Sequence, residues 1–124
     1  MVVADTDVII AAIRGNEMAK SILRKYAPGG IYISLITEIE LHIGATNASK
    51  KTAIKKVLES HETLPLNKAI GELALKLVKT YNTKSKSLYL ADALIAATCL
   101  HYNFRLVTFN SKDFTIIKGL QFAK

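Results

Sequence analysis

The chain has 124 residues, half of them hydrophobic, which suits one compact domain spanning residues 1–124 and is too short for two. No apolar run approaches the roughly 18 residues of a membrane span, and no signal-peptide pattern opens the chain, so we expect a cytoplasmic protein. The single cysteine excludes an intrachain disulfide and a cysteine-rich zinc site, while the net charge of +7 fits either RNA binding or a solvated lysine surface.

The apolar pattern predicts short strands that alternate with helices. We expect strands at 2–4, 31–33, 62–66, 105–109 and 120–123, and helices at 6–15, 17–26, 35–44, 47–60, 67–82 and 87–100. A polar loop is expected at 83–87 and a turn at 110–114. Alternating strands and helices favour an α/β fold of three layers (α/β/α), in which helices cover both faces of a parallel sheet of four to five short strands.

Two of the aspartates follow predicted strands. Asp5 comes directly after the apolar run 2–4, and Asp113 lies a few residues after "LVTF" at 106–109. Because the carboxyl ends of parallel strands meet at one edge of the sheet, both side chains are expected at that edge, where ligands bind in such folds.

A third aspartate, Asp92, stands in the otherwise apolar stretch "SLYLADALIAATCL" at 87–100. No basic residue lies within one helical turn of it. An unpaired buried carboxylate costs several kcal/mol. A metal ion, a distant basic group or protonation therefore has to compensate for its burial.

The stretch "SLITEIELHIG" carries another acid of interest. Ile36, Ile39 and Ile43 are expected to form the apolar stripe of this helix. Glu40 lies at the edge of that stripe and is predicted to point inward. Glu38 lies roughly opposite and is predicted to face solvent.

Asp5, Glu40, Asp92 and Asp113 thus come from four elements, and each has its own reason to face the sheet edge or the interior. Converging carboxylates repel one another and raise each other's pKa, so a basic chain that gathers its few acids needs a cation there. Oxygen ligands without cysteine or histidine favour Mg²⁺ or Mn²⁺ over zinc, as one ion or two. Such a site suits phosphodiester hydrolysis.

Four segments stand in order over nearly the whole chain: "VVADTDVIIAAI", "ISLITEIELHIGA", "ADALIAATCL" and "LVTFNSKDF". Together they resemble the PIN domain and, more narrowly, the VapC-type toxin ribonucleases of toxin–antitoxin pairs. The resemblance implies a PIN-like fold and a Mg²⁺- or Mn²⁺-dependent endoribonuclease that inhibits translation or growth. It also implies an RNA substrate, a homodimer, and a cognate antitoxin held by the apolar helices within 7–26 and 35–45.

The resemblance also assigns roles to residues. It implies that the acids already singled out are catalytic and bind the metal: Asp5, Glu40, Asp92 and Asp113. It implies that a second group of polar side chains supports these acids: Thr6, Ser34, Thr37, Thr108 and Asn110.

Three positions depart from the family pattern. Asp7 stands where asparagine is common, and it could add charge to the site or cap the first helix. Leu90 replaces a further acid found in some members, and Phe109 replaces a basic residue found in many. An extra metal ligand and one phosphate contact therefore lack their usual residues, but the four main acids are complete and predict an active enzyme.

Two other functions share some of these sequence features. A phosphoacceptor receiver domain would need an aspartate at the end of its third strand, and none occurs between Asp7 and Asp92. A non-catalytic PIN-like module that binds RNA or protein stays open, although binding alone does not require four converging acids. The tyrosines are read as packing residues rather than as platforms for bases, and Cys99 as a core residue.

Overall fold

The computed structural model describes residues 1–84 and 87–123. Strands and helices alternate over this part of the chain, as the sequence predicts. The strands are β1 Val2–Ala4, β2 Ile31–Ser34, β3 Glu62–Leu64 and β4 Arg105–Val107. The α-helices are α1 Thr6–Ile13, α2 Glu17–Tyr26, α3 Leu35–Gly44, α4 Ala48–Ser60, α5 Lys68–Tyr81 and α6 Leu90–Tyr102, with short 3₁₀ helices η1 Ala27–Gly29 and η2 Ser111–Asp113.

The strands form one parallel sheet in the order β3-β2-β1-β4. The chain builds outward from β1 to β2 and β3, then returns to place β4 on the other side of β1. The strand order therefore reverses at β1, and the crevice beyond the carboxyl ends of β1 and β4 is the place where such sheets bind ligands. Residues Asp5 and Thr108 follow these two strands directly.

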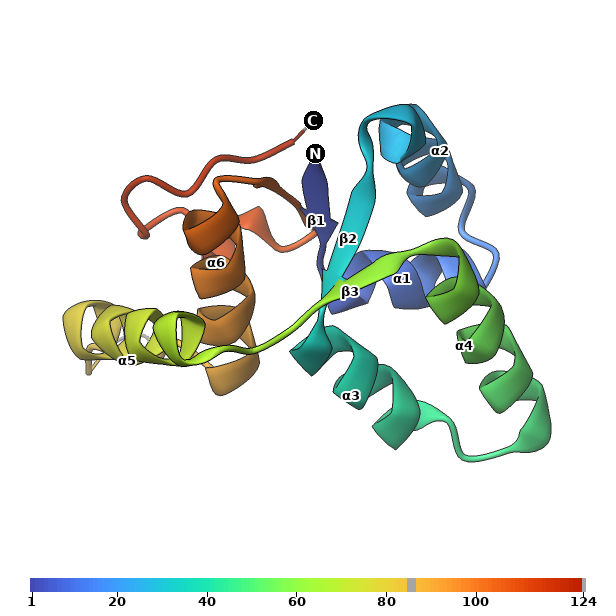
Figure 1. Ribbon diagram of the computed structural model, residues 1–124, viewed down its shortest axis with the longest axis horizontal. Coiled ribbons are helices and arrows are strands. Elements are labelled where there is room, and N and C mark those ends of the chain that lie inside the picture. The colour runs from blue at the N-terminus through green and yellow to red at the C-terminus, as the bar shows by residue number, and fades with distance from the viewer. Residues whose placement is uncertain (85–86, 124) are drawn as a thin grey trace.

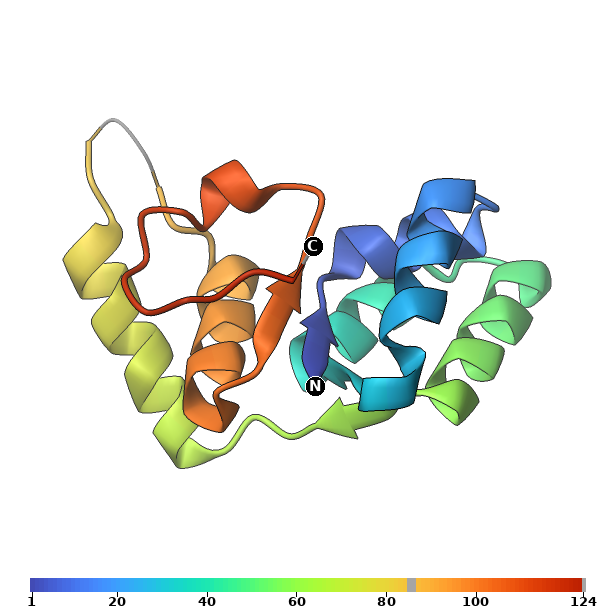
Figure 2. The same ribbon diagram turned by 90° about the horizontal axis from the view of Figure 1, so that it is seen from above.

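Helices cover both faces of the sheet (Figure 1). Successive strand residues face opposite sides, so Val3 and Leu106 pack into one hydrophobic cluster with residues of α5 and α6. Val2 and Val107 pack on the other side with Val8 of α1. Figure 2 shows the same separation, with α5 and α6 on one side and α1, α2 and α4 on the other. The three layers predicted from the sequence are confirmed.

Helix ends follow local chemistry. The side chains of Asn16, Asn47 and Asn67 accept hydrogen bonds from backbone N–H groups in the first turns of α2, α4 and α5. Gly15, with a φ of +89°, lies just beyond α1, where a left-handed conformation favours glycine. These residues begin and end the helices close to the predicted positions.

Two predicted details differ, and one lies partly outside the described residues. The segment near 120–123 is not a strand but makes a single parallel bridge between Leu106 and Phe122, so the described sheet has four strands. α6 begins at Leu90 rather than residue 87. Part of the predicted polar loop, residues 85–86, lies outside the described residues. Over the described ranges, no helix combines the length and the apolar character needed to cross a bilayer.

Candidate active site

Asp5 lies at the carboxyl end of β1 and is only 6% exposed. Its Oδ1 accepts a hydrogen bond of 2.7 Å from the backbone N–H of Thr6, which caps α1, and its Oδ2 accepts one of 2.8 Å from the Thr108 hydroxyl. Both carboxylate oxygens are therefore oriented, one by the helix that follows β1 and one by the residue that follows β4. Thr108, one of the predicted supporting residues, thus contacts one of the predicted acids.

Asp7 lies one turn further into α1 and joins the same edge to the segment after β4. Its Oδ2 accepts hydrogen bonds from the backbone N–H of Phe109 at 3.2 Å and from Asn110 Nδ2 at 2.8 Å. Among the described residues its Oδ1 is buried without a hydrogen-bond partner. Because Asp5 caps the helix, Asp7 instead adds a carboxylate to the site and holds the segment 109–110.

Glu40 points inward from α3, as predicted. Its Oε1 lies 2.7 Å from the hydroxyl oxygen of Thr6, which in turn lies 2.9 Å from that of Thr37. The Thr6 hydroxyl has one proton and donates it to the carboxylate, so Thr37 is left to donate to Thr6. These three side chains form a chain of hydrogen bonds that orients Glu40.

The predicted apolar stripe of α3 is wrong for Ile39 and Ile43, whereas Ile36 packs against the hydrophobic cluster that includes α5 and α6. Ile39 and Ile43 are 43% and 74% exposed, whereas Thr37 and Leu41 form the buried face. The helix turns its buried face toward the threonine pair and the adjoining hydrophobic cluster, because Thr37 can satisfy its hydroxyl there. The spacing of the isoleucines alone predicted a different buried face for this helix.

The charges of Asp92 and Asp113 act on the two acids that follow β1. Burial raises the pKa of Asp5 from its ordinary value of 3.8 to about 7, and the charges of Asp7 and Asp92 add to this increase. Burial also raises the pKa of Asp7, with the charge of Asp113 adding to it. The charge of Asp92 in the first turn of α6 thus acts on Asp5, and that of Asp113 in η2 acts on Asp7.

Two of the predicted supporting residues have different partners. Ser34 is fully buried, and its hydroxyl accepts a hydrogen bond from the backbone N–H of Ile36 at the start of α3. Asn110 contacts Asp7 rather than one of the four predicted acids. Nothing local in the sequence pairs Asp7 with Asn110, because 103 positions separate them.

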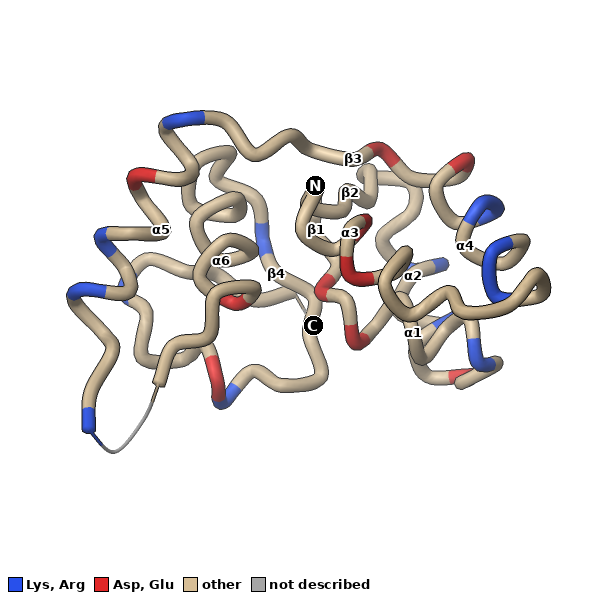
Figure 3. Tube along the Cα trace, turned by 90° about the horizontal axis from the view of Figure 1, so that it is seen from below, with Lys and Arg blue, Asp and Glu red and all other residues tan. Residues whose placement is uncertain are grey.

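The side chains that could bind a cation at this site offer oxygen atoms, mainly from carboxylates. In Figure 3 acidic positions of several elements gather near the middle of the molecule, while many basic positions lie on α4 and α5. Burial raises the pKa of the nearby Cys99 to about 12, so it offers no thiolate. Within residues 1–84 and 87–123, no group of three or more aspartate, glutamate, histidine or cysteine side chains stands close enough together to hold a metal ion. The buried, unpartnered Oδ1 of Asp7 and the raised pKa of Asp5 nevertheless fit carboxylates that lack a neutralising cation.

The chain matches a known protein family. The family model of the PIN domain matches residues 2–120. The chain belongs to the PIN-domain family. Within that family this PIN domain is similar to ribonuclease VapC1 of Rickettsia felis, with 33% identity over 126 residues that cover 96% of the chain and 92% of the relative. The VapC resemblance seen in the sequence is confirmed.

Solved structures agree with this placement. A toxin–antitoxin complex from Klebsiella pneumoniae contains a chain that aligns with the PIN domain at a TM-score of 0.82 and 30% identity, covering 97% and 95% of the two chains. VapBC2 of Rickettsia felis, bound to a promoter DNA fragment, aligns at a TM-score of 0.89 with 23% identity, covering 99% and 98%. The latter likeness concerns the fold alone, and it matches the predicted PIN-like architecture.

Proposed function

We propose that this PIN domain is a metal-dependent endoribonuclease of the VapC type, the toxin of a toxin–antitoxin pair. One observation carries the proposal. Asp5 and Asp7 lie at the point where the strand order reverses, and the charges of Asp92 on α6 and Asp113 in η2 act on them, in a chain with a net charge of +7. A gathering of like charges in a basic protein is the arrangement that a divalent cation and a phosphodiester substrate require.

The residues that would hold the cation are Asp5, Glu40, Asp92 and Asp113, with Asp7 beside them. Carboxylate oxygens suit Mg²⁺ or Mn²⁺. When bound, such a cation would polarise the phosphoryl oxygen, lower the pKa of an attacking water and stabilise the leaving oxygen. Whether one ion or two is held depends on how many of these carboxylates take part.

The protein's own residues orient the acids. Thr108 and the N–H of Thr6 fix the two oxygens of Asp5, so its carboxylate keeps one orientation at the sheet edge. The Thr37–Thr6 pair does the same for Glu40. Side chains held by such partners lose little conformational freedom when substrate binds, and losing such a partner typically costs about 10–100-fold in metal affinity or activity.

The proposal is tested by incubating the purified protein with a panel of defined single-stranded and hairpin RNAs. We expect cleavage with Mg²⁺ or Mn²⁺ and none in EDTA, because the carboxylates alone cannot activate water. Mapping the product ends would show whether cleavage is internal. Cleavage that persists in EDTA, or none of any RNA with either cation, would contradict the proposal.

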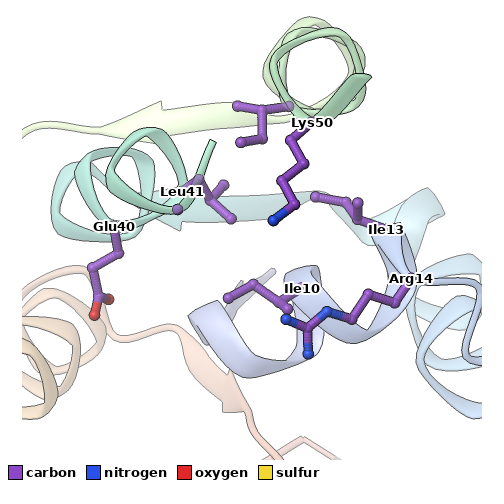
Figure 4. A pocket seen from close by; sticks show the side chains of 8 residues that line it. Ile10, Ile13, Arg14, Glu40, Leu41 and Lys50 are labelled. Carbon is purple, nitrogen blue, oxygen red and sulfur yellow. The ribbon is translucent and has the colours of Figure 1, made fainter. Parts of the chain in front are cut away.

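We also infer that the antitoxin binds a cavity of about 140 Å³ between α1, α3 and α4. Isoleucine and leucine side chains contribute most of its lining: Ile10, Ile13, Leu41 and Ile54. In Figure 4 Arg14 and Lys50 reach toward the same space from opposite sides, whereas the Glu40 carboxylate points away from it. An apolar side chain next to a carboxylate would complement this cavity, so the antitoxin segment is expected to carry both.

Reversing the two charges tests this contact. The double variant Arg14→Glu/Lys50→Glu should weaken antitoxin binding by at least about tenfold, measured by titration calorimetry, because an acidic segment then meets like charges. The matched control is Lys76→Glu/Lys79→Glu on the exposed side of α5. Equal weakening in both double variants would contradict a specific contact at the cavity. A homodimer and a cytoplasmic location stay predictions.

A further inference from the structure

Two aromatic side chains stand apart from the rest. The chain has five tyrosines and four phenylalanines and no tryptophan. All nine lie in the described residues, and seven pack in the hydrophobic clusters around the sheet: Tyr26, Tyr32, Tyr81, Tyr102, Phe104, Phe114 and Phe122. Phe109 and Tyr89 belong to none of these clusters and are 41% and 69% exposed. The reading of every tyrosine as a packing residue is therefore wrong for Tyr89.

Phe109 is held at the acidic cluster by its backbone. The residue before it, Thr108, donates to Asp5, and its own N–H donates to Asp7 at 3.2 Å. The next side chain, Asn110, also donates to Asp7. With three consecutive residues bound to the two acids, the exposed ring of Phe109 lies at the edge of the site.

Tyr89 comes to the same edge from another element. It is the N-cap residue of α6, and the first turn of that helix carries Asp92, whose charge acts on Asp5. Only two residues join the end of α6 to β4, so the helix runs back along the sheet and its beginning lies at the carboxyl edge. The exposed residues Tyr89, at the start of α6, and Phe109, two residues after β4, thus lie at the same edge of the sheet.

Resting on the proposed function, we propose that Phe109 and Tyr89 bind RNA by stacking on unpaired bases next to the scissile phosphodiester. Aromatic rings bind bases by stacking, largely irrespective of sequence. Bases in an A-form duplex are stacked on each other and offer no free face, so only unpaired nucleotides gain from these rings.

At position 109, a ring that stacks on a base would take the place of a charged side chain that binds a phosphate. A basic residue at position 109 would neutralise a phosphate, and its contribution would fall as salt rises. A phenyl ring releases no counterion. The contribution of Phe109 should therefore be nearly independent of salt concentration, which separates stacking from a phosphate contact.

The experiment measures the affinity of a fluorescent single-stranded RNA, by anisotropy, in the Asp5→Asn background with Mg²⁺ present so that the RNA stays intact. We expect Phe109→Ala and Tyr89→Ala each to weaken binding about tenfold, with the slope of log affinity against log salt unchanged. Phe109→Trp should restore affinity. Leu75→Ala, which removes an exposed apolar side chain on α5, is the matched control and should change nothing.

The same variants are then bound to the RNA sequence held in a hairpin duplex, where the alanine substitutions should have no effect. Unchanged affinity for the single strand, an equal loss with Leu75→Ala or an equal loss on the duplex would each overturn the inference. Cleavage by the wild-type protein is scored separately. If the wild-type protein cleaves RNA but the alanine variants bind RNA as tightly as before, only the stacking inference is refuted. If the variants lose affinity but the wild-type protein cleaves no RNA, the proposed enzyme activity is refuted.

Discussion

Replacing Asp5 with asparagine should reduce RNA cleavage by well over a hundredfold. The buried Asp5 carboxylate lies at the centre of the electrostatic cluster, where Asp7 and Asp92 both act on it. Loss of a residue that merely supports a metal ligand typically costs about 10–100-fold, so loss of a ligand charge should cost more. Single-turnover cleavage of one RNA, with the cation in excess, measures the effect.

The Asp5→Asn variant should fold, so a loss of cleavage can be assigned to the missing carboxylate. Asparagine can still accept the hydrogen bond from the Thr6 N–H at the start of α1. The matched control is Glu62→Gln, which removes an exposed acid from the edge strand β3 and should cleave as the wild type does. Near-normal cleavage by Asp5→Asn would remove Asp5 from the catalytic group, as would an equal loss in both variants.

The free energy of unfolding should fall as the pH rises from about 4 to about 7. Asp5 has a pKa of 3.8 without the fold and about 7 within it. Between these values the folded chain holds a proton that the unfolded chain has released, so rising pH favours unfolding. The shift of roughly three pKa units corresponds to up to about 4 kcal/mol. Urea titrations of the wild type and Asp5→Asn across this range measure the difference, and the variant should lose the part of this dependence that Asp5 contributes, while the raised pKa of Asp7 leaves the rest.

Divalent cations should reverse this loss at the upper end of the range. A carboxylate must be ionised to bind a cation, so Mg²⁺ or Mn²⁺ should raise the urea midpoint of the wild type near pH 8 more than near pH 5. The burial penalty and the repulsion from Asp7 are then offset by the bound charge. Equal pH dependence in wild type and Asp5→Asn would contradict the raised pKa, and an equal cation effect at both pH values would contradict carboxylate binding.

Local sequence patterns predicted most of the fold. β-branched runs, asparagine caps and the glycine at position 15 act over a few residues, so they can be read without knowing the rest of the chain. The failures have tertiary causes. The stripe expected on α3 followed its isoleucines, but the helix buries Thr37, whose hydroxyl pairs with that of Thr6 on α1. The segment 120–123 has strand-like residues yet makes only one bridge.

The sequence by itself determined the parallel α/β architecture, the family, and the expectation that Asp5 and Asp113 share one edge, since strand direction alone requires it. Only the tertiary structure decided which partners the acids have. Asp7 accepts hydrogen bonds from residues 109 and 110, Thr6 links Asp5 to Glu40, and the side chains of Phe109 and Tyr89 are left exposed. Hydrogen bonds and burial depend on distances between segments up to 103 residues apart, and no local pattern encodes those distances.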